Sequence, residues 1–280
     1  MDGSPGGYYI KKGDPEKYII HLEGGGWCEN EDDCLVRSKT DMGSSKNWKT
    51  GVIPTMDGGA HGMFNPDRAL NPDFWNHTMV FVCYCDGASF AGNVSDPVPV
   101  LGGMLNFKGR TILDATIASL LKGGMKKAKN VIVKGGSAGG LAVYLHIDHI
   151  RDVIPKAIDV TGLADGGFFL DTPDWEGVSR FTPIYQYVSE MQNVQTDVGC
   201  EQYFTGGQAW MCFMAPYVSV FVSTDMYILN SFYDTWQLAN ILNLDCAGNI
   251  SECQGAQKVV LQQQRGAMLT SIKAVLQMKG

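Results

Sequence analysis

The fold is decided by residues 131–150, VIVKGGSAGGLAVYLHIDHI, where a β-branched run leads through a glycine-flanked serine into a helical pattern. Residues 135–139 match G-x-S-x-G, a motif that needs a strand before it and a helix after it. The turn is so tight that its serine takes strained dihedrals, and a side chain two positions away would collide with the neighbouring strand or helix. In this context the motif predicts an α/β fold in which Ser137 is a nucleophile.

A glycine-rich turn between a strand and a helix can also bind phosphate. Such loops carry G-x-G-x-x-G or end in Gly-Lys-Ser/Thr, and residues 135–139 have neither pattern. We therefore favour acyl transfer, for which backbone amides must bind the oxyanion. The amide of Ala138 is one candidate donor, and the loop EGGGWC at residues 23–28 supplies the others, with Gly26 and Trp27 expected. The alternative for this loop is a tight turn without a catalytic role.

Short apolar runs alternate with helical patterns along the chain, which is typical of a mostly parallel central sheet with helices on both faces. Strands are expected within residues 17–26, 77–87, 130–137, 157–167 and 225–234, and helices within 106–127, from 138 onward, within 234–242 and within 256–279. Residues 29–70, rich in Gly, Asp, Asn and Ser, are expected to form a long irregular insertion. We interpret residues 1–280 as a single α/β domain.

The composition excludes several classes of function. With a net charge of −7 and no basic cluster beyond Lys126, Lys127 and Lys129, the chain lacks the surface that binds nucleic acid. No apolar run reaches the roughly 18 residues of a membrane span. No apolar segment follows Met1 as it would in a signal peptide. No metal and no cofactor are implied, and we expect a monomer.

Eight cysteines bear on the compartment of the protein. Cys83 and Cys85 alternate within a predicted strand, which fits buried, reduced thiols. Two pairs have the short spacing of local disulfides and a third pair could form, and these pairs are Cys28 with Cys34, Cys246 with Cys253, and Cys200 with Cys212. Reduced thiols throughout, in a cytosolic enzyme, are the alternative.

Three N-glycosylation sequons, which begin at Asn76, Asn93 and Asn249, also favour the secretory route. Together with the cysteine spacing they predict a secreted protein of the extracellular space or cell wall.

Several blocks of the chain resemble, in order, the pectin acetylesterase and Notum family of carboxylesterases, within the α/β-hydrolase superfamily. These blocks are DGSPGGYYI, IIHLEGGGWC, NPDFWNHTMVFVCYCDGASFAGN, LNFKGRTILDATIASLL, VIVKGGSAGGLAVYLHID, GLADGGFFLD, CFMAPY and ILNSFYDTWQLANIL. The resemblance implies that Ser137 is the nucleophile and Asp234 the acid of a catalytic triad. It also implies that Gly26, Trp27 and Ala138 form the oxyanion hole.

The residues alone agree with Asp234 as the acid, because it follows a late strand in the hydrolase order Ser, Asp, His. Asp165 ends the preceding predicted strand and is the alternative acid, and the family pattern favours Asp234. Either aspartate could instead cap the helix that follows it.

The general base is harder to assign, because it must lie within about 3 Å of the serine oxygen. His146 and His149 lie roughly 13 to 18 Å along the helix that follows the serine. His21 lies about 16 Å upstream of the oxyanion loop, and His77 is expected at the opposite end of its strand. His61, in the loop GGAHGMF, is the histidine of this chain that the geometry leaves open.

The resemblance accounts for the missing base. The catalytic histidine of the family follows the final helix in a short segment with cysteines, and this sequence ends at VLQMKG. A signal peptide and an early strand are likewise expected ahead of DGSP. We interpret the chain as incomplete at both ends, and we expect it to be almost inactive alone.

The expected function is ester hydrolysis through an acyl-enzyme. By resemblance the substrate is an acetyl ester on pectin or a related cell-wall polysaccharide, whereas the animal branch of the family deacylates a lipidated signalling protein. A deep apolar pocket would favour the lipid and a shallow polar cleft the sugar, and Trp27 could line either. The alternative is a catalytically inactive binding protein that kept the hydrolase fold.

Overall fold

The computed structural model describes residues 1–46, 48–49 and 62–278. Within them the central sheet has the strand order β1-β3-β2-β6-β7-β8, in which β1 pairs antiparallel with β3 and all other neighbours pair in parallel. The strands are β1 (Tyr8–Lys11), β2 (Asp14–Leu22), β3 (His77–Val82), β6 (Asn130–Gly136), β7 (Asp159–Asp165) and β8 (Met226–Leu229). The predicted α/β-hydrolase-like fold with a mostly parallel sheet is confirmed.

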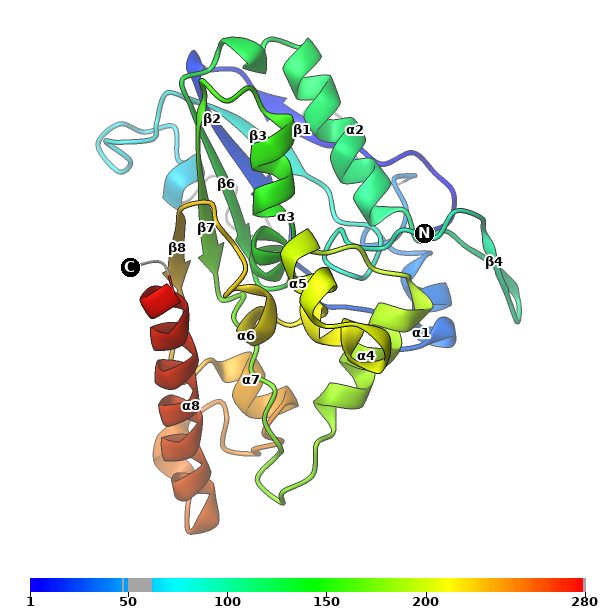
Figure 1. Ribbon diagram of the computed structural model, residues 1–280, viewed down its shortest axis with the longest axis vertical. Helices are drawn as coiled ribbons and strands as arrows, with labels where there is room; N and C mark the ends of the chain where they lie inside the picture. Colours follow the sequence, from blue (N-terminus) through cyan, green and yellow to red (C-terminus); the bar gives the residue numbers. More distant parts are fainter. Residues whose placement is uncertain (47, 50–61, 279–280) are drawn as a thin grey trace.

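Helices flank this sheet (Figure 1). The long helices α2 (Gly109–Lys122) and α3 (Ala138–Val153) lie on one face, because their buried side chains join the same core cluster as Ile20 and Val82. The helix α8 (Ala256–Met278) runs beside β8. The shorter helices are α1 (Glu31–Arg37), α4 (Phe181–Met191), α5 (Val198–Tyr203), α6 (Ala215–Val218) and α7 (Thr235–Asn240), with 3-10 turns η1 (Gly62–Phe64), η2 (Met125–Lys127), η3 (Gly206–Phe213) and η4 (Ile250–Glu252).

The burial pattern explains why the apolar runs form strands. All six residues of β3 are buried, as expected for an inner strand that is covered on both faces. Val80 and Val82 pack towards α2 and α3, whereas Met79 packs on the other face with Ile19 and Phe64. The core therefore lies on both sides of the sheet at this strand.

The prediction of an irregular insertion over residues 29–70 is wrong for its first part, which contains α1. Asn30 is the N-cap of that helix, since its side chain accepts a hydrogen bond from the amide of Asp33 at 2.9 Å. An acidic first turn adds a favourable interaction with the helix dipole. The cap residue and the acidic turn are both visible in the sequence. The prediction of an irregular segment followed instead from the many glycines and serines later in residues 29–70.

Three disulfides fix local loops, and they join Cys28 with Cys34, Cys200 with Cys212, and Cys246 with Cys253. They include the two pairs that the short spacing favoured and the third pair, Cys200 with Cys212, that could form. Cys83 and Cys85 are buried free thiols, also as predicted.

Candidate active site

Four neighbouring parallel strands end at the same edge of the sheet. Leu22 of β2 pairs with Gly135 of β6, Gly136 with Asp165 of β7, and Asp165 with Leu229 of β8. The loops that follow these strands therefore begin side by side, and they contain the EGGGWC loop, Ser137, a glycine pair and the Asp234 segment. Ligands bind at this edge in open α/β sheets.

Ser137 lies between β6 and α3 in a strained conformation. Its φ is 55° and its ψ −124°, in a region that residues with side chains rarely occupy. The side chain is exposed, while the backbone is held by a hydrogen bond from its amide to the carbonyl of Asp165 at 2.9 Å. The strain presents the hydroxyl to solvent at the first turn of α3, the arrangement expected of a nucleophile.

The two glycines that flank Ser137 are required by close contacts. A Cβ on Gly139 would lie 2.1 Å from the carbonyl oxygen of Leu22, and a Cβ on Gly135 would lie 2.0 Å from the carbonyl oxygen of Gly139. Both obstacles are main-chain atoms that cannot move independently. A side chain at either glycine would therefore collide with the main chain, as the G-x-S-x-G motif predicted.

The EGGGWC loop lies directly against the serine. A Cβ on Gly24 would be 3.2 Å from the Cβ of Ser137. The next two residues, Gly25 and Gly26, have φ values of 135° and 67°, which turn the chain sharply beside Ser137. Ala138 follows the serine as the first residue of α3, with its side chain buried. Gly24 and Ala138 therefore lie beside Ser137 at one corner of the sheet edge, and the other two predicted oxyanion residues, Gly26 and Trp27, follow Gly24 in the same loop.

Trp27 belongs to an aromatic cluster next to that corner. Its ring centroid is 4.9 Å from that of Tyr185, 5.0 Å from Phe169 and 5.7 Å from Trp236, and Phe181 completes the group. Most of these rings meet edge to face or tilted, the favourable arrangement for aromatic pairs. Because Trp236 lies on α7, the cluster connects the oxyanion loop to the helix that Asp234 begins.

Asp234 is the N-cap of α7, and its Oδ1 accepts a hydrogen bond from the amide of Gln237 at 2.9 Å. Its Oδ2 lies on the other side, 4.0 Å from the position that a Cβ on Gly166 would occupy, and the amide nitrogen of Ser137 lies 4.0 Å from that same position. Burial raises the pKa of the Asp234 carboxyl, and main-chain amides of Gln237 and Trp236 oppose this increase.

Asp165, the alternative acid, is also at this edge, as the last residue of β7. Its side chain is exposed, and its carbonyl group accepts the amide of Ser137. Asp165 thus holds Ser137 through its backbone, whereas Asp234 has a partly buried carboxyl group.

The four histidines that the structure describes are occupied elsewhere. His146 is fully buried in α3, with Nε2 3.0 Å from the carbonyl oxygen of Ser89, and burial lowers its pKa to about 3. His149 pairs with Asp114 at 2.7 Å. His21 contacts the rings of Phe64 and Phe81 inside the sheet, and His77 opens β3 at the opposite end. His61 lies outside the described residues.

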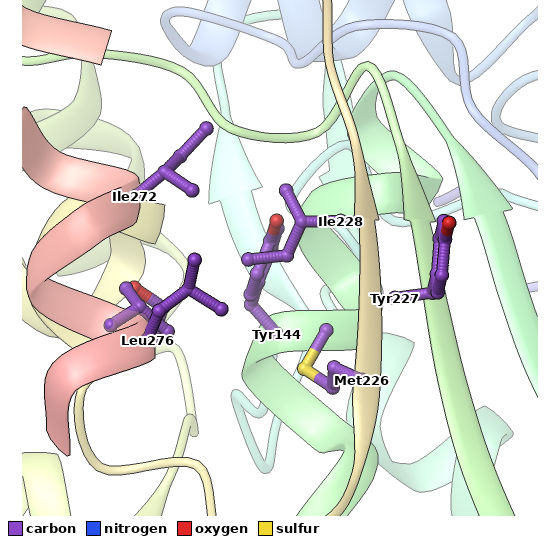
Figure 2. A pocket seen from close by; sticks show the side chains of 8 residues that line it. Tyr144, Met226, Tyr227, Ile228, Ile272 and Leu276 are labelled. Carbon is purple, nitrogen blue, oxygen red and sulfur yellow. The ribbon is translucent and has the colours of Figure 1, made fainter. Parts of the chain in front are cut away.

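One cavity has a lining that includes none of the site residues described above (Figure 2). It has a volume of about 290 Å³ and lies between α3, β8 and α8, with Tyr144, Met226, Ile228 and Ile272 among its lining residues. None of the predicted site residues lines it. In the part of the chain that the structure describes, no group of three His, Cys, Asp or Glu side chains could hold a metal ion, and no helix could span a membrane.

Sequence reasoning missed three residues that hold the oxyanion loop. Arg37 donates to the carbonyl of Gly25, Tyr84 donates to the carbonyl of Gly26, and Ser89 accepts from the indole of Trp27. Trp27 and Ser89 are 62 positions apart, so no local pattern connects them. Tyr84 and Ser89 lie within residues 71–93, which carry part of the family resemblance, but nothing in that segment links them to the EGGGWC loop.

Comparisons of the sequence with known proteins identify related esterases. A protein-family model described as Pectinacetylesterase matches residues 1–280. Pectin acetylesterase 5 of Arabidopsis thaliana is 34% identical over 285 residues, covering 97% of this chain and 65% of that protein, and pectin acetylesterase 7 is 32% identical over 290 residues. Palmitoleoyl-protein carboxylesterase notum2 of Xenopus laevis is 32% identical over 251 residues, covering 85% of this chain and 50% of that protein. The chain thus spans about two thirds of one plant relative and half of an animal one.

Proposed function

Since the chain belongs to the pectinacetylesterase family, we propose that it is the main part of a secreted serine esterase that removes acetyl groups from pectin or a related polysaccharide. The relatives are named as a pectin acetylesterase and a palmitoleoyl-protein carboxylesterase, which supports esterase activity for this chain. The observation that carries the serine mechanism is the juxtaposition of the strained, exposed Ser137 with the glycine loop on one side and the Asp234 carboxylate on the other.

In the proposed reaction the Oγ of Ser137 attacks the acetyl carbon, and its proton passes to a histidine base. The negative charge that develops on the carbonyl oxygen is bound by the amides of Gly26, Trp27 and Ala138. The sugar hydroxyl leaves with the proton from the histidine, and an acetyl-enzyme remains. Water then attacks the acetyl-enzyme and releases acetate, which regenerates the serine hydroxyl. Asp234 orients the histidine and stabilises its charged form.

The base in this proposal is not one of the described histidines, because each of these has another partner or position. The family resemblance assigns it to a segment after α8, and His61 is the alternative within this sequence. Removal of a triad member leaves only the residual rate of the oxyanion hole and of binding. We therefore expect residues 1–280 alone to hydrolyse p-nitrophenyl acetate barely above background.

The test uses the protein together with whatever sequence follows Gly280 in its gene. Ser137→Ala should lower kcat/KM for p-nitrophenyl acetate, and acetate release from acetylated pectin, by about a thousandfold or more. The exposed Ser179 provides the control, and Ser179→Ala should leave both rates unchanged. A fluorophosphonate should label the wild type at the peptide containing Ser137. Full activity of Ser137→Ala would refute the serine mechanism.

Deacylation of a lipidated protein is the second candidate, because notum2, a palmitoleoyl-protein carboxylesterase, is 32% identical to this chain. The aromatic cluster around Trp27 favours the acetyl ester, since Phe169, Phe181 and Tyr185 are buried and each packs against the Trp27 ring. Rates with p-nitrophenyl acetate and p-nitrophenyl octanoate separate the two functions. A preference for octanoate would favour the lipid substrate.

A further inference from the structure

The oxyanion loop has a side chain bound to each of its two consecutive carbonyl groups. Arg37 donates from Nη1 to the carbonyl oxygen of Gly25 at 2.8 Å. Tyr84 donates from its hydroxyl to the carbonyl oxygen of Gly26 at 2.8 Å. These carbonyls belong to the two peptide groups whose amides, on Gly26 and Trp27, are the proposed oxyanion donors.

Peptide geometry links each carbonyl to the amide on the other side of the bond. In a planar trans peptide the C=O of one residue and the N–H of the next point in opposite directions, and the described chain contains no cis peptide. A side chain that holds the oxygen of Gly25 therefore fixes the direction of the Gly26 amide. Likewise, holding the oxygen of Gly26 fixes the direction of the Trp27 amide.

Such restraint is needed at this loop because its residues have little intrinsic preference. Gly25 and Gly26 both have positive φ values, 135° and 67°, which glycine shares with several other conformations of similar energy. Without external partners the two peptide planes could rotate and turn the amides away from Ser137. Oxyanion donors contribute to catalysis only if they are oriented before the charge develops.

We propose that Arg37 and Tyr84 are positioning residues that hold the two oxyanion amides of the Gly25-Gly26-Trp27 segment towards Ser137. This inference rests on the proposed function. In this role both residues act through the peptide groups that they hold.

The two side chains are themselves fixed. The guanidinium carbon of Arg37 lies 4.9 Å from the ring centroid of Tyr84, and its Nε donates to the carbonyl of Met42 at 3.1 Å. Arg37 is the last residue of α1, a helix tied to the oxyanion loop by the Cys28–Cys34 disulfide. The restraint on Gly25 is therefore anchored in a helix.

The hydroxyl of Tyr84 is held by a second hydrogen bond, from the segment that contains Ser89. Its hydroxyl oxygen accepts the amide of Ser89 at 2.9 Å while its hydrogen is donated to Gly26. Burial raises the pKa of Tyr84 far above its ordinary value, so the hydroxyl remains a donor at all working pH values. Ser89 also binds the other end of the segment, because its Oγ accepts the indole N–H of Trp27 at 2.9 Å.

The Ser89 loop is rigid enough to serve as this anchor. The buried carboxylate of Asp86 accepts the amides of Ala88, Phe90 and Gly92 at 3.3, 3.1 and 2.9 Å. The imidazole of His146 forms a fourth hydrogen bond, to the carbonyl oxygen of Ser89. These four hydrogen bonds hold the loop that contains Ser89 in place.

The test compares Tyr84→Phe with Tyr144→Phe in the active, full-length protein. Tyr84→Phe keeps the buried ring and removes only the hydroxyl, so kcat for p-nitrophenyl acetate should fall about 10- to 100-fold while KM changes less than threefold, because oxyanion contacts act in the transition state. Tyr144 is equally buried, and among the described residues its hydroxyl has no hydrogen-bond partner (Figure 2). Tyr144→Phe should therefore leave kcat unchanged.

A second readout separates positioning from general destabilisation. The inhibition constant of a trifluoromethyl ketone, which mimics the tetrahedral intermediate, should rise by the same factor by which kcat/KM falls. Arg37→Lys gives a further measurement if Tyr84→Phe does not fold, since one ammonium cannot replace the separate bonds of the guanidinium to Gly25 and Met42. It should also lower kcat and leave KM nearly unchanged.

The outcomes distinguish the two proposals. If Ser137→Ala remains active, the proposed serine mechanism fails, whatever the other variants do. If Ser137→Ala is inactive and both Tyr84→Phe and Arg37→Lys have wild-type kcat, the esterase stands and the positioning role is overturned. A loss that appears in KM alone would also overturn it.

Discussion

The two oxygens of the Asp234 carboxylate face different groups, so the structural and the catalytic interpretation of this residue are compatible. Oδ1 caps α7, as one sequence interpretation expected, and Oδ2 faces the side on which Gly166 and Ser137 lie. Sequence order could select this aspartate because it follows a late strand. It could not show that the cap leaves one oxygen available, since that depends on how α7 is directed.

Replacing Asp234 with asparagine should separate these roles. Asparagine caps a helix as well as aspartate does, but it cannot stabilise a charged histidine, so kcat should fall by about a thousandfold or more. Because burial raises the folded pKa of Asp234, its ionised form is unfavourable in the fold above that pKa, and the penalty disappears below the unfolded pKa. Asp234→Asn should therefore match or exceed the wild-type free energy of unfolding at pH 7, by urea denaturation, and lose any advantage near pH 3.

Asp197 provides the control for that experiment. It is the N-cap of α5, its side chain accepts the amide of Cys200 at 3.0 Å, and burial raises its pKa as well. Asp197→Asn should have a similarly small effect on stability and leave kcat unchanged. Equal activity of the two variants would contradict the role proposed for Asp234.

At the scale of elements, periodicity located the pieces that carry the site. The apolar runs predicted β2, β3, β6, β7 and β8, because each strand overlaps a run bounded by glycine or an acid. The strand β2 begins earlier than its run, at Asp14. The periodicity did not predict β1, because its sequence YYIK is short and half exposed. The segment between β7 and β8, which holds α4, η3 and α6, also gave no clear pattern, since it is organised by a disulfide and by aromatic contacts between distant residues.

Two glycine-to-alanine changes should have opposite effects on stability. Gly139→Ala would place a Cβ 2.1 Å from the carbonyl oxygen of Leu22, and we expect it to lower the free energy of unfolding by about 2–4 kcal/mol. Gly266 lies exposed in the middle of α8 with no atom near its added Cβ. Gly266→Ala should raise that free energy by about 0.5–1 kcal/mol. Urea denaturation followed by circular dichroism measures both, and a Gly139→Ala variant as stable as wild type would disprove the tight contact between α3 and β2.

At the scale of the whole molecule, three closed loops agree with an oxidising compartment. The disulfides join residues 6, 12 and 7 positions apart, and they fix the oxyanion loop, the α5–η3 segment and the region before α8. Short spacing favoured two of these pairs, Cys28 with Cys34 and Cys246 with Cys253, and allowed the third, Cys200 with Cys212. The sequence did not show what the disulfides hold in place, since only the fold shows that the first one lies beside the candidate site.

Thiol measurements should reproduce this arrangement. Burial raises the pKa of Cys83 strongly and that of Cys85 to about 11, so neither should react with iodoacetamide in the native protein near pH 8. Two thiols should react after denaturation without reductant, and eight after reduction. Because the loops are short, each disulfide should contribute about 2–3 kcal/mol, and reduction should lower Tm. Eight reactive thiols without reductant would favour the cytosolic alternative.

The position of His146 has a mechanical consequence. α3 begins one residue after Ser137, and nine residues beyond that serine its imidazole grips the carbonyl of Ser89, the loop that also secures the indole of Trp27. One helix therefore connects Ser137, next to its first turn, with the loop that holds the indole of Trp27. If α3 shifts along its axis, we expect Ser137 and the Ser89 loop to shift with it, so that the distance between Ser137 and Trp27 changes little.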